Sequence, residues 1–71
     1  MSADNVIYIQ KIGSEYHVWE TSASIEDPKP GGRSHEKYEN VCEARAYAFG
    51  LLQGFDIVEY GVQHLPDKEK S

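Results

Sequence analysis

The sequence contains one cysteine and no long apolar run. Cys42 has no second cysteine with which to form a disulfide within the chain, and a lone free thiol is typical of a reducing compartment. The opening residues, MSADN, lack the charged and then apolar layout of a secretory signal, so we expect a cytoplasmic protein. A membrane-spanning helix needs roughly 18–20 apolar residues, and no run approaches that length. We therefore expect no membrane association.

Basic side chains are also scarce. Seven lysines and arginines stand against twelve aspartates and glutamates, which gives a net charge of −5. Nucleic acid phosphates attract clustered lysine and arginine, so this balance disfavours general nucleic acid binding. It is typical of a small acidic protein that stays in solution or meets a basic partner.

What is present is enough for one small domain over residues 1–71. Apolar residues make up 39% of the chain, and a core of this size supplies only about 3–5 kcal/mol of net stability. Chains this short often gain stability from disulfides, a bound metal or self-association. Because an internal disulfide is excluded, self-association becomes an expectation to test.

The first third of the chain predicts a β-hairpin. Residues 5–12 (NVIYIQKI) and 15–22 (EYHVWETS) are rich in β-branched and aromatic types, and both segments are too short for typical helices. Gly13 and Ser14 between them suit a two-residue type II′ turn, with glycine at the first central position. Each segment should therefore be a strand, and the two strands should be antiparallel.

This hairpin would be apolar on both of its faces. The two-residue turn places Tyr8 opposite Trp19, whereas a bulged turn with Gly13 in the left-handed region would shift this register. With the two-residue turn, one face carries Ile7, Ile9, Tyr16 and Val18, and the other carries Val6, Tyr8, His17 and Trp19. A single helix can cover only one of these faces.

A long connection precedes the single predicted helix. Residues 23–37 contain prolines and two consecutive glycines, which break regular structure, so we expect a mobile loop. Asn40 is a suitable N-cap residue, and Glu43 three positions later makes a capping-box variant. Apolar residues then recur at helical spacing as far as Gly54, which we expect to end the helix at the C′ position.

The remainder completes the predicted fold. Residues 55–63 (FDIVEYGVQ) predict the last strand, and residues 65–71 a disordered tail. A helical crossover makes the last strand parallel to the strand at 15–22, and therefore antiparallel to the strand at 5–12. The expected fold class is α+β: a β-β-α-β order with a three-stranded antiparallel sheet, order 2-1-3, and one helix packed on one face.

Three segments of the chain, SADNVIYI, EARAYAFGLL and VEYGV, resemble a group of small uncharacterised bacteriophage and bacterial proteins. Those proteins begin with Ser-Ala-Asp-Asn and an apolar strand, carry a Glu-Ala…Tyr-Ala helix and end near an acidic-Tyr-Gly strand. The resemblance covers roughly 35 of the 71 residues. It implies a phage or prophage-associated background, and it brings no assigned activity and no catalytic residues.

The residues that carry reactive groups form no recognisable catalytic or metal-binding pattern. Cys42 lies in an acidic first helical turn without a nucleophile motif, so we expect a packed structural cysteine. His17, His35 and His64 lack the close spacing of a zinc site. The carboxylates alternate with apolar residues or lie in the loop, and PGGR lacks the spacing of a phosphate-binding loop. We expect no enzyme activity, no metal and no cofactor.

The uncovered hairpin face is the first candidate partner site. It carries Tyr8, His17 and Trp19, and tyrosine and tryptophan are favoured at the centres of interfaces. The competing interpretation is that Tyr8 and Trp19 only stack across the two strands and stay half exposed.

The long loop is the second candidate. Lys29, Arg33 and Lys37 form a local basic patch, which suits either an anionic partner or an ordinary solvated loop. Taken together, these features predict a small protein-binding module that acts on a protein partner that the sequence does not identify. It would form a homodimer through the sheet face that carries Tyr8 and Trp19 or through the edge of a strand. The alternatives are a nucleic-acid-associated protein that uses this loop, and an acidic decoy that mimics DNA.

Overall fold

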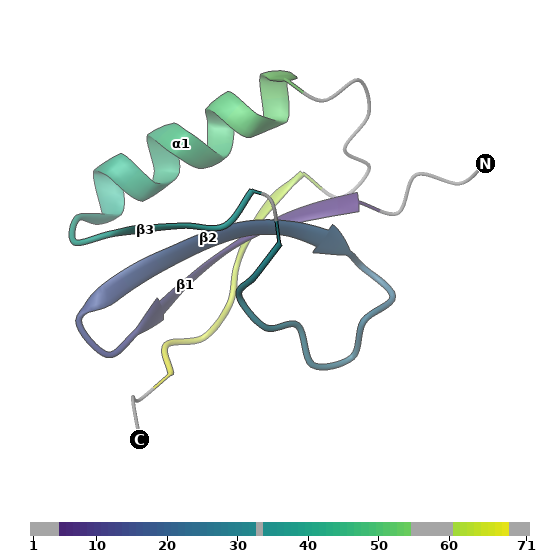
Figure 1. Cartoon of the computed structure of the whole chain (residues 1–71), viewed down its shortest axis with the longest axis horizontal. Helices are drawn as coiled ribbons and strands as arrows, with labels where there is room; N and C mark the ends of the chain where they lie inside the picture. The colour runs from purple at the N-terminus through teal and green to yellow at the C-terminus, as the bar shows by residue number, and fades with distance from the viewer. Residues whose placement is uncertain (1–4, 33, 55–60, 69–71) are drawn as a thin grey trace.

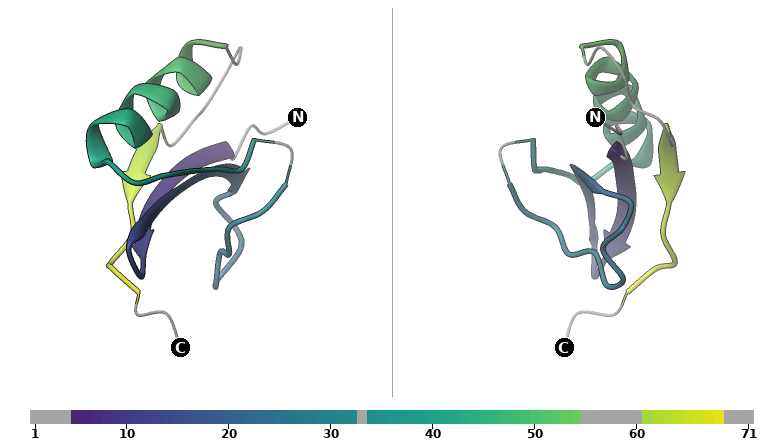
Figure 2. Two further views of the ribbon diagram at one scale, coloured as in Figure 1. Left: turned by 60° about the vertical axis from the view of Figure 1, so that its left-hand side comes forward. Right: turned by 90° about the vertical axis from the view of Figure 1, so that its right-hand side faces the viewer.

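The computed structural model describes residues 5–32, 34–54 and 61–68 (Figure 1). Its elements, in chain order, are β1 (Asn5–Ile12), β2 (Glu15–Ser22), β3 (Glu36–Tyr38), α1 (Val41–Gly54) and β4 (Val62–His64). The described strands form one mixed sheet in the order β3-β2-β1-β4, and α1 lies on one side of it (Figure 2). The α+β class is confirmed, but the sheet has a fourth strand and is not purely antiparallel.

The hairpin has the predicted strands and register. β1 and β2 pair antiparallel along their whole length, with Ile12 opposite Glu15 and Tyr8 opposite Trp19. Gly13 has a φ of 64°, while no non-glycine residue among those described, Ser14 included, has a positive φ. A type II′ turn needs a positive φ only at its first central residue. The two-residue turn is therefore confirmed, and the bulged alternative is wrong.

The short strand β3 determines the direction of β4 relative to β1. β3 pairs antiparallel with β2, with Tyr16 opposite Tyr38, so β3 runs parallel to β1. α1 connects β3 to β4, and β4 pairs parallel with β1, with Ile7 opposite Val62. The rule that a helical crossover joins parallel strands still holds. The strand before the helix, however, is β3 and not β2, which makes the predicted antiparallel last strand wrong.

The segment predicted as loop, residues 23–37, therefore ends in regular structure. Glu36 and Lys37 belong to β3, which has only 3 residues. Alternation of polar and apolar residues needs a run of about 4–8 residues to be recognised as a strand. β3 is too short to carry that pattern, and only its position against β2 identifies it.

The C-terminal segment is hydrogen-bonded to β1. The backbone N of Lys68 donates to the Lys11 carbonyl oxygen at 2.8 Å, and the Lys68 carbonyl oxygen accepts from Gly13 N at 3.0 Å. The sequence predicts disorder over 65–71, but residues 65–68 are held against β1 in this way. The rest of that segment lies outside the described residues.

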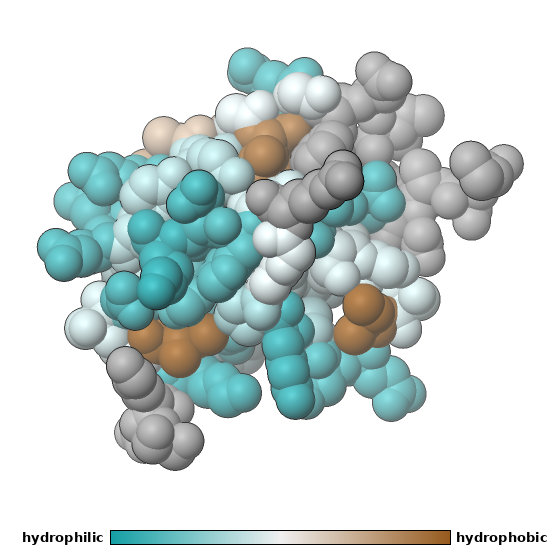
Figure 3. Space-filling model, viewed as in Figure 1, coloured by the Kyte–Doolittle hydropathy of each residue, from teal (hydrophilic) through white to brown (hydrophobic). Residues whose placement is uncertain are grey.

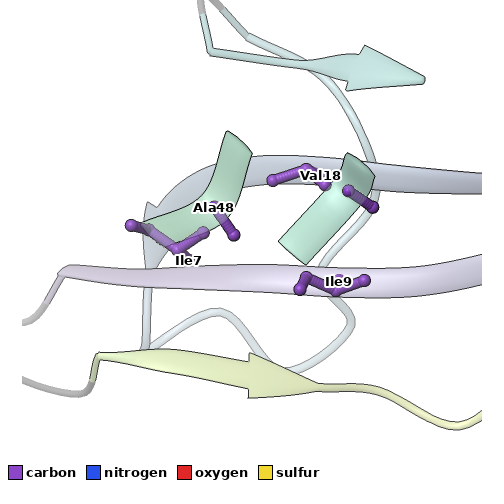
Figure 4. Packing of buried hydrophobic residues seen from close by; sticks show 5 residues of the cluster. Ile7, Ile9, Val18 and Ala48 are labelled. Atoms are coloured by element: carbon purple, nitrogen blue, oxygen red, sulfur yellow. The ribbon is translucent and has the colours of Figure 1, made fainter. Parts of the chain in front are cut away.

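The larger core lies between α1 and the sheet. Its buried members are Ile7, Ile9, Val18, Ala44 and Ala48, and Figure 4 shows Ala48 lying close to Ile7 of β1. The two alanines have short side chains, so the helix axis can approach the strands closely while branched side chains from the sheet fill the space between. Partly buried tyrosines and leucines surround this cluster.

The helix begins where the sequence predicts and ends differently. Cys42 N donates to Asn40 Oδ1 at 2.7 Å, which confirms Asn40 as the N-cap residue. Gly54 is the last residue of α1 and does not have a positive φ, so it lies in the helix and is not a left-handed C′ residue. Residues 55–60, the larger part of the predicted last strand, lie outside the described residues.

The cap gives the first testable prediction. We expect Asn40→Ala to lower the free energy of unfolding by about 1 kcal/mol, because the backbone N–H of Cys42 loses its acceptor. Asn40→Asp keeps an acceptor oxygen at the helix N-terminus and should stay within about 0.5 kcal/mol of the wild type. Urea unfolding followed by circular dichroism measures both. Equal losses in the two variants would show that the cap does not stabilise α1.

Candidate functional site

The sheet face opposite α1 is covered within the single chain. Trp19 is 1% exposed, Tyr8 is 8% exposed and Val6 is fully buried. The Tyr8 and Trp19 rings contact each other across the strands, with centroids 5.6 Å apart and an angle of 51° between their planes. The predicted exposed aromatic surface is therefore wrong, because these rings are enclosed rather than presented to a partner.

Among the described residues, two segments outside the regular elements contribute to this cover. Ala23, which follows β2, and Leu65, which follows β4, both pack against the Val6–Tyr8–Trp19 cluster. Figure 2 shows the connection between β2 and β3 on the side of the sheet away from α1. We call residues 23–32 the covering segment. Counting helices alone omitted this layer, which is why the aromatic face appeared to be open.

Trp19 is buried without a polar partner. Its Nε1 atom has no hydrogen-bond acceptor in the described structure. Buried indole N–H groups usually have an acceptor, and a buried donor without one costs about 1–3 kcal/mol. The position of Trp19 is therefore fixed by apolar packing and not by a hydrogen bond.

Two histidines that are distant in the sequence meet at the end of the covering segment. His17 Nδ1 and His35 Nε2 are 2.9 Å apart, and the ring planes differ by only 13°. The centroids are 5.1 Å apart. That separation is close to the N···N distance plus one ring radius on either side, so the rings lie edge to edge and nearly coplanar. One nitrogen donates a hydrogen bond to the other.

Among the predicted partner-binding residues that the structure describes, His17 makes a side-chain hydrogen bond. His17 is half-buried on β2, and its strand partner on β3 is Lys37. No sequence pattern connects His17 with His35, since they are 18 positions apart and only the β2–β3 pairing brings them together. The pair of histidines was therefore not predicted from the sequence.

A tyrosine pair anchors the segment before β3 to the helix. Tyr47 Oη donates to the Ser34 carbonyl oxygen at 2.9 Å, and the Tyr38 and Tyr47 rings have centroids 5.7 Å apart. Burial, and then the nearby Glu36 carboxylate, raise the pKa of both phenols above the ordinary value; the Glu43 carboxylate adds a smaller effect on the pKa of Tyr38.

The predicted basic patch is not assembled by the described residues. Lys29 is exposed in the covering segment and Lys37 is exposed on β3, but no contact between them is described. Arg33 lies outside the described residues. The nucleic acid alternative consequently has no structural observation that favours it over a solvated loop.

The outer face of α1 has an unusual composition for a surface helix. Its exposed residues along the central stripe are Cys42, Ala46, Phe49, Gly50 and Gln53. These positions recur every three or four residues, which places them on one side of a helix. None of them is charged, although an outward helix face normally carries charged groups.

Two side chains on this stripe are informative. Phe49 is 45% exposed and, with Ile25 at 46%, is one of the large exposed hydrophobic residues among those described. Cys42 is exposed, so the expected packed cysteine is wrong. In the view of Figure 3 the hydrophobic residues form separate patches and not one continuous surface.

Gly50 has no packing role against the residues that the structure describes. A Cβ atom built on it would meet no heavy atom within 4 Å. Glycine within a helix costs about 1 kcal/mol relative to alanine, and nothing in the described structure offsets that cost. No close contact among the described residues therefore requires a glycine at position 50.

The described residues were also compared with the requirements of a metal site and of a membrane-spanning helix, and the chain with known proteins. No group of three or more histidine, cysteine, aspartate or glutamate side chains within 5–32, 34–54 and 61–68 is arranged to hold a metal ion. Over the same residues, no helix has both the length and the apolar character to cross a membrane. No family model matches the chain, and no curated protein or solved structure is significantly similar to it.

The unpartnered indole gives a prediction for two Trp19 variants. Trp19→Ala removes the largest buried side chain, at a cost of about 3–5 kcal/mol, so we expect a largely unfolded chain. Trp19→Phe keeps most of the apolar contact and removes the buried donor, so we expect a loss of only about 1 kcal/mol. Denaturant unfolding measures both. A Phe variant as unstable as the Ala variant would mean that the indole N–H has a partner.

The tyrosine pair gives a prediction for alkaline pH. Because both phenols have a raised pKa in the folded chain, their contribution to stability is complete below the ordinary pKa of about 10. It is lost as the pH rises through the folded-state pKa. We expect Tyr47→Phe to reduce this alkaline loss and Tyr16→Phe, outside the pair, to leave it unchanged. Urea unfolding at several alkaline pH values, with tyrosinate absorbance, tests this expectation.

Proposed function

We propose that the chain is a small non-enzymatic protein-binding module that forms a homodimer through the outer face of α1. The observation that carries this proposal is the exposed Phe49 beside Gly50, whose missing side chain serves no contact with the described residues. An uncharged outer stripe is expected when another element packs against a helix. This proposal keeps the predicted self-association. It replaces the sheet face by the outer face of α1 as the surface through which two copies associate.

The shape of this stripe is self-complementary. Phe49 projects, while Ala46 and Gly50 next to it leave a shallow gap. In an antiparallel pair of α1 helices with a two-fold axis midway between positions 46 and 49, Phe49 of each copy lies on Ala46 of the other. An interface with such a two-fold axis uses the same patch on both copies. Small residues at the contact allow the helix backbones to approach closely.

The charges around the stripe suit this arrangement. Glu43 and Arg45 flank it on opposite sides, and both are exposed, so the centre of the interface would bury no charged group. Charged residues are depleted at interface cores for the same reason. The net charge of −5 works against association, and this repulsion is screened by salt.

The size of the helix limits the strength of the dimer. α1 has 14 residues, and a helix of that length is about 21 Å long. Its outer face offers much less than the roughly 800 Å² per partner of a standard stable interface. We therefore expect weak association, with a Kd between about 10 μM and 1 mM. Such a surface also suits an exchangeable helix from another protein. A phage or prophage setting is supported only by the sequence resemblance.

Two substitutions in α1 test the proposal. Phe49→Ala should weaken dimerisation about tenfold or more, because an apolar aromatic side chain loses its burial at the interface. Gly50→Ala should also weaken it, since the added Cβ fills the gap that the second copy's Phe49 approaches. The same Gly50→Ala change should raise the free energy of unfolding of the monomer by about 0.5–1 kcal/mol. Sedimentation velocity over a concentration series and urea unfolding of dilute samples provide the measurements.

Ile25→Ala is the matched control, because Ile25 is equally exposed but lies outside α1. It should leave the association constant unchanged. A wild-type chain that is monomeric at about 1 mM would refute self-association at the strength expected here. Equal effects of Ile25→Ala and Phe49→Ala would move the interface away from α1.

A further inference from the structure

A short segment continues beyond β4 along the edge of β1, and we call its residues 65–68 the C-terminal strap. Leu65 N donates to the Ile9 carbonyl oxygen at 2.9 Å, and Lys68 N donates to the Lys11 carbonyl oxygen at 2.8 Å. In Figure 2 the segment runs from β4 towards the turn between β1 and β2. The strap therefore pairs with the part of β1 next to that turn.

The pairing register shifts by one residue between β4 and the strap. β4 places His64 opposite Ile9, and an unbroken parallel register would then place Asp67 opposite Ile12. Ile12 instead pairs with Lys68, so the C-terminal strand gains one residue, as in a β-bulge. Because this irregularity interrupts the ladder, the strap is attached to β1 as a unit separate from β4.

Leu65 is the residue of the strap that takes part in a hydrophobic cluster. It packs against the Val6–Tyr8–Trp19 cluster, whereas the other three residues of the strap are exposed. Val62 of β4 packs instead against the larger core on the helix side of the sheet. Local opening requires less free energy where fewer apolar contacts must be broken. We therefore expect the strap to open more readily than β4.

The composition of the strap is that of a protected sheet edge. Pro66 has no backbone N–H with which a further strand could pair, and its carbonyl oxygen accepts from Gln10 Nε2 at 3.0 Å. Asp67 and Lys68 are charged and exposed. Proline and charged side chains at an edge prevent another strand from adding to the sheet. The strap thus closes the edge of β1 without offering an equivalent edge of its own.

We propose that the strap occupies, within the chain, a binding site for an extended peptide segment of another protein at the edge of β1. The bound segment runs parallel to β1 and places a leucine-like side chain where Leu65 packs. Its backbone takes the hydrogen bonds that the strap makes with the Ile9 and Lys11 carbonyl oxygens and with Gly13 N–H. Peptides that add to a sheet edge gain affinity from main-chain hydrogen bonds and specificity from alternate side chains.

Competition by the strap keeps this site closed in the wild-type chain. A tethered segment acts at an effective concentration in the millimolar range, so a free peptide binds weakly while the strap stays attached. Weakening the strap should therefore strengthen the binding of a peptide added in trans. The site lies at the edge of β1 and on the sheet face opposite α1, so it does not depend on the proposed helix dimer.

A peptide titration of the full chain tests the proposal. The probe is a synthetic peptide of residues 63–68 (QHLPDK) with blocked ends. Leu65→Asp brings a charge against the apolar cluster, and Lys68→Pro removes the N–H that donates to Lys11. In both variants the peptide should shift the NMR signals of the Trp19 indole and the Gly13 amide saturably, with a Kd of about 1 mM. Its binding to the wild type should be about tenfold weaker or more.

A second peptide and a third variant are the controls. The peptide with aspartate in place of its leucine should not bind, because the apolar contact is lost. Adding Phe49→Ala to Lys68→Pro should leave peptide binding unchanged, since Phe49 lies on α1. Failure of the helix dimer and failure of this site are thereby distinguished. The proposal is overturned if neither strap variant binds the peptide, if the wild type binds it equally well, or if both peptides bind alike.

Hydrogen exchange of the wild-type chain provides a measurement that needs no variant. The amides of Leu65, Lys68 and Gly13 are the donors of the strap's backbone hydrogen bonds, and Ile7 N donates to the Gly61 carbonyl oxygen at 2.9 Å next to β4. If the strap opens as a unit, the first three amides share one protection factor, about tenfold or more below that of Ile7. Equal protection of all four amides would show that the strap does not open separately, and would also overturn the proposal.

Discussion

The structure depends on covering both faces of one β-hairpin. β1 and β2 place Ile7, Ile9 and Val18 on one side and Val6, Tyr8 and Trp19 on the other, and all six side chains are buried. Burying a large apolar side chain contributes about 1.5–3 kcal/mol, and a chain of 71 residues has few such side chains to use. Each face therefore needs its own covering layer, and the rest of the chain supplies the two layers by different means.

The helix side is covered by a regular element and the other side by irregular ones. α1 brings short alanines against the sheet, so branched residues from β1 and β2 fill the interface. On the opposite side, Ala23 and Leu65 approach from segments that follow β2 and β4. Irregular segments have fewer backbone hydrogen bonds of their own, so local opening requires less free energy there than in the helix–sheet core. We therefore expect the two faces of the sheet to differ in how readily they open.

Features determined by neighbouring residues could be predicted from the sequence. Gly13 at the first turn position determines the register of the hairpin, and Asn40 begins the helix, because each acts on a backbone group within a few residues. Features that depend on distant contacts could not. β3 exists because three residues pair with β2, and that pairing alone reverses the expected direction of β4. The burial of Trp19, the His17–His35 contact and the exposure of Cys42 also follow from long-range packing that leaves no local pattern.

The outward positions of α1 belong to neither covering layer. Once Ala44 and Ala48 face the sheet, the outward positions of the helix contribute nothing to the core, so selection for folding alone would favour charged residues there. The chain instead places Phe49 and an unfavourable helical glycine at those positions. The exposed Phe49 adds little to the stability of an isolated monomer, and Gly50 lowers the stability of the helix. A second element packed against α1 would bury Phe49 and could approach closely at Gly50. These two residues are therefore the ones on which the proposed contact at the outer face of α1 rests.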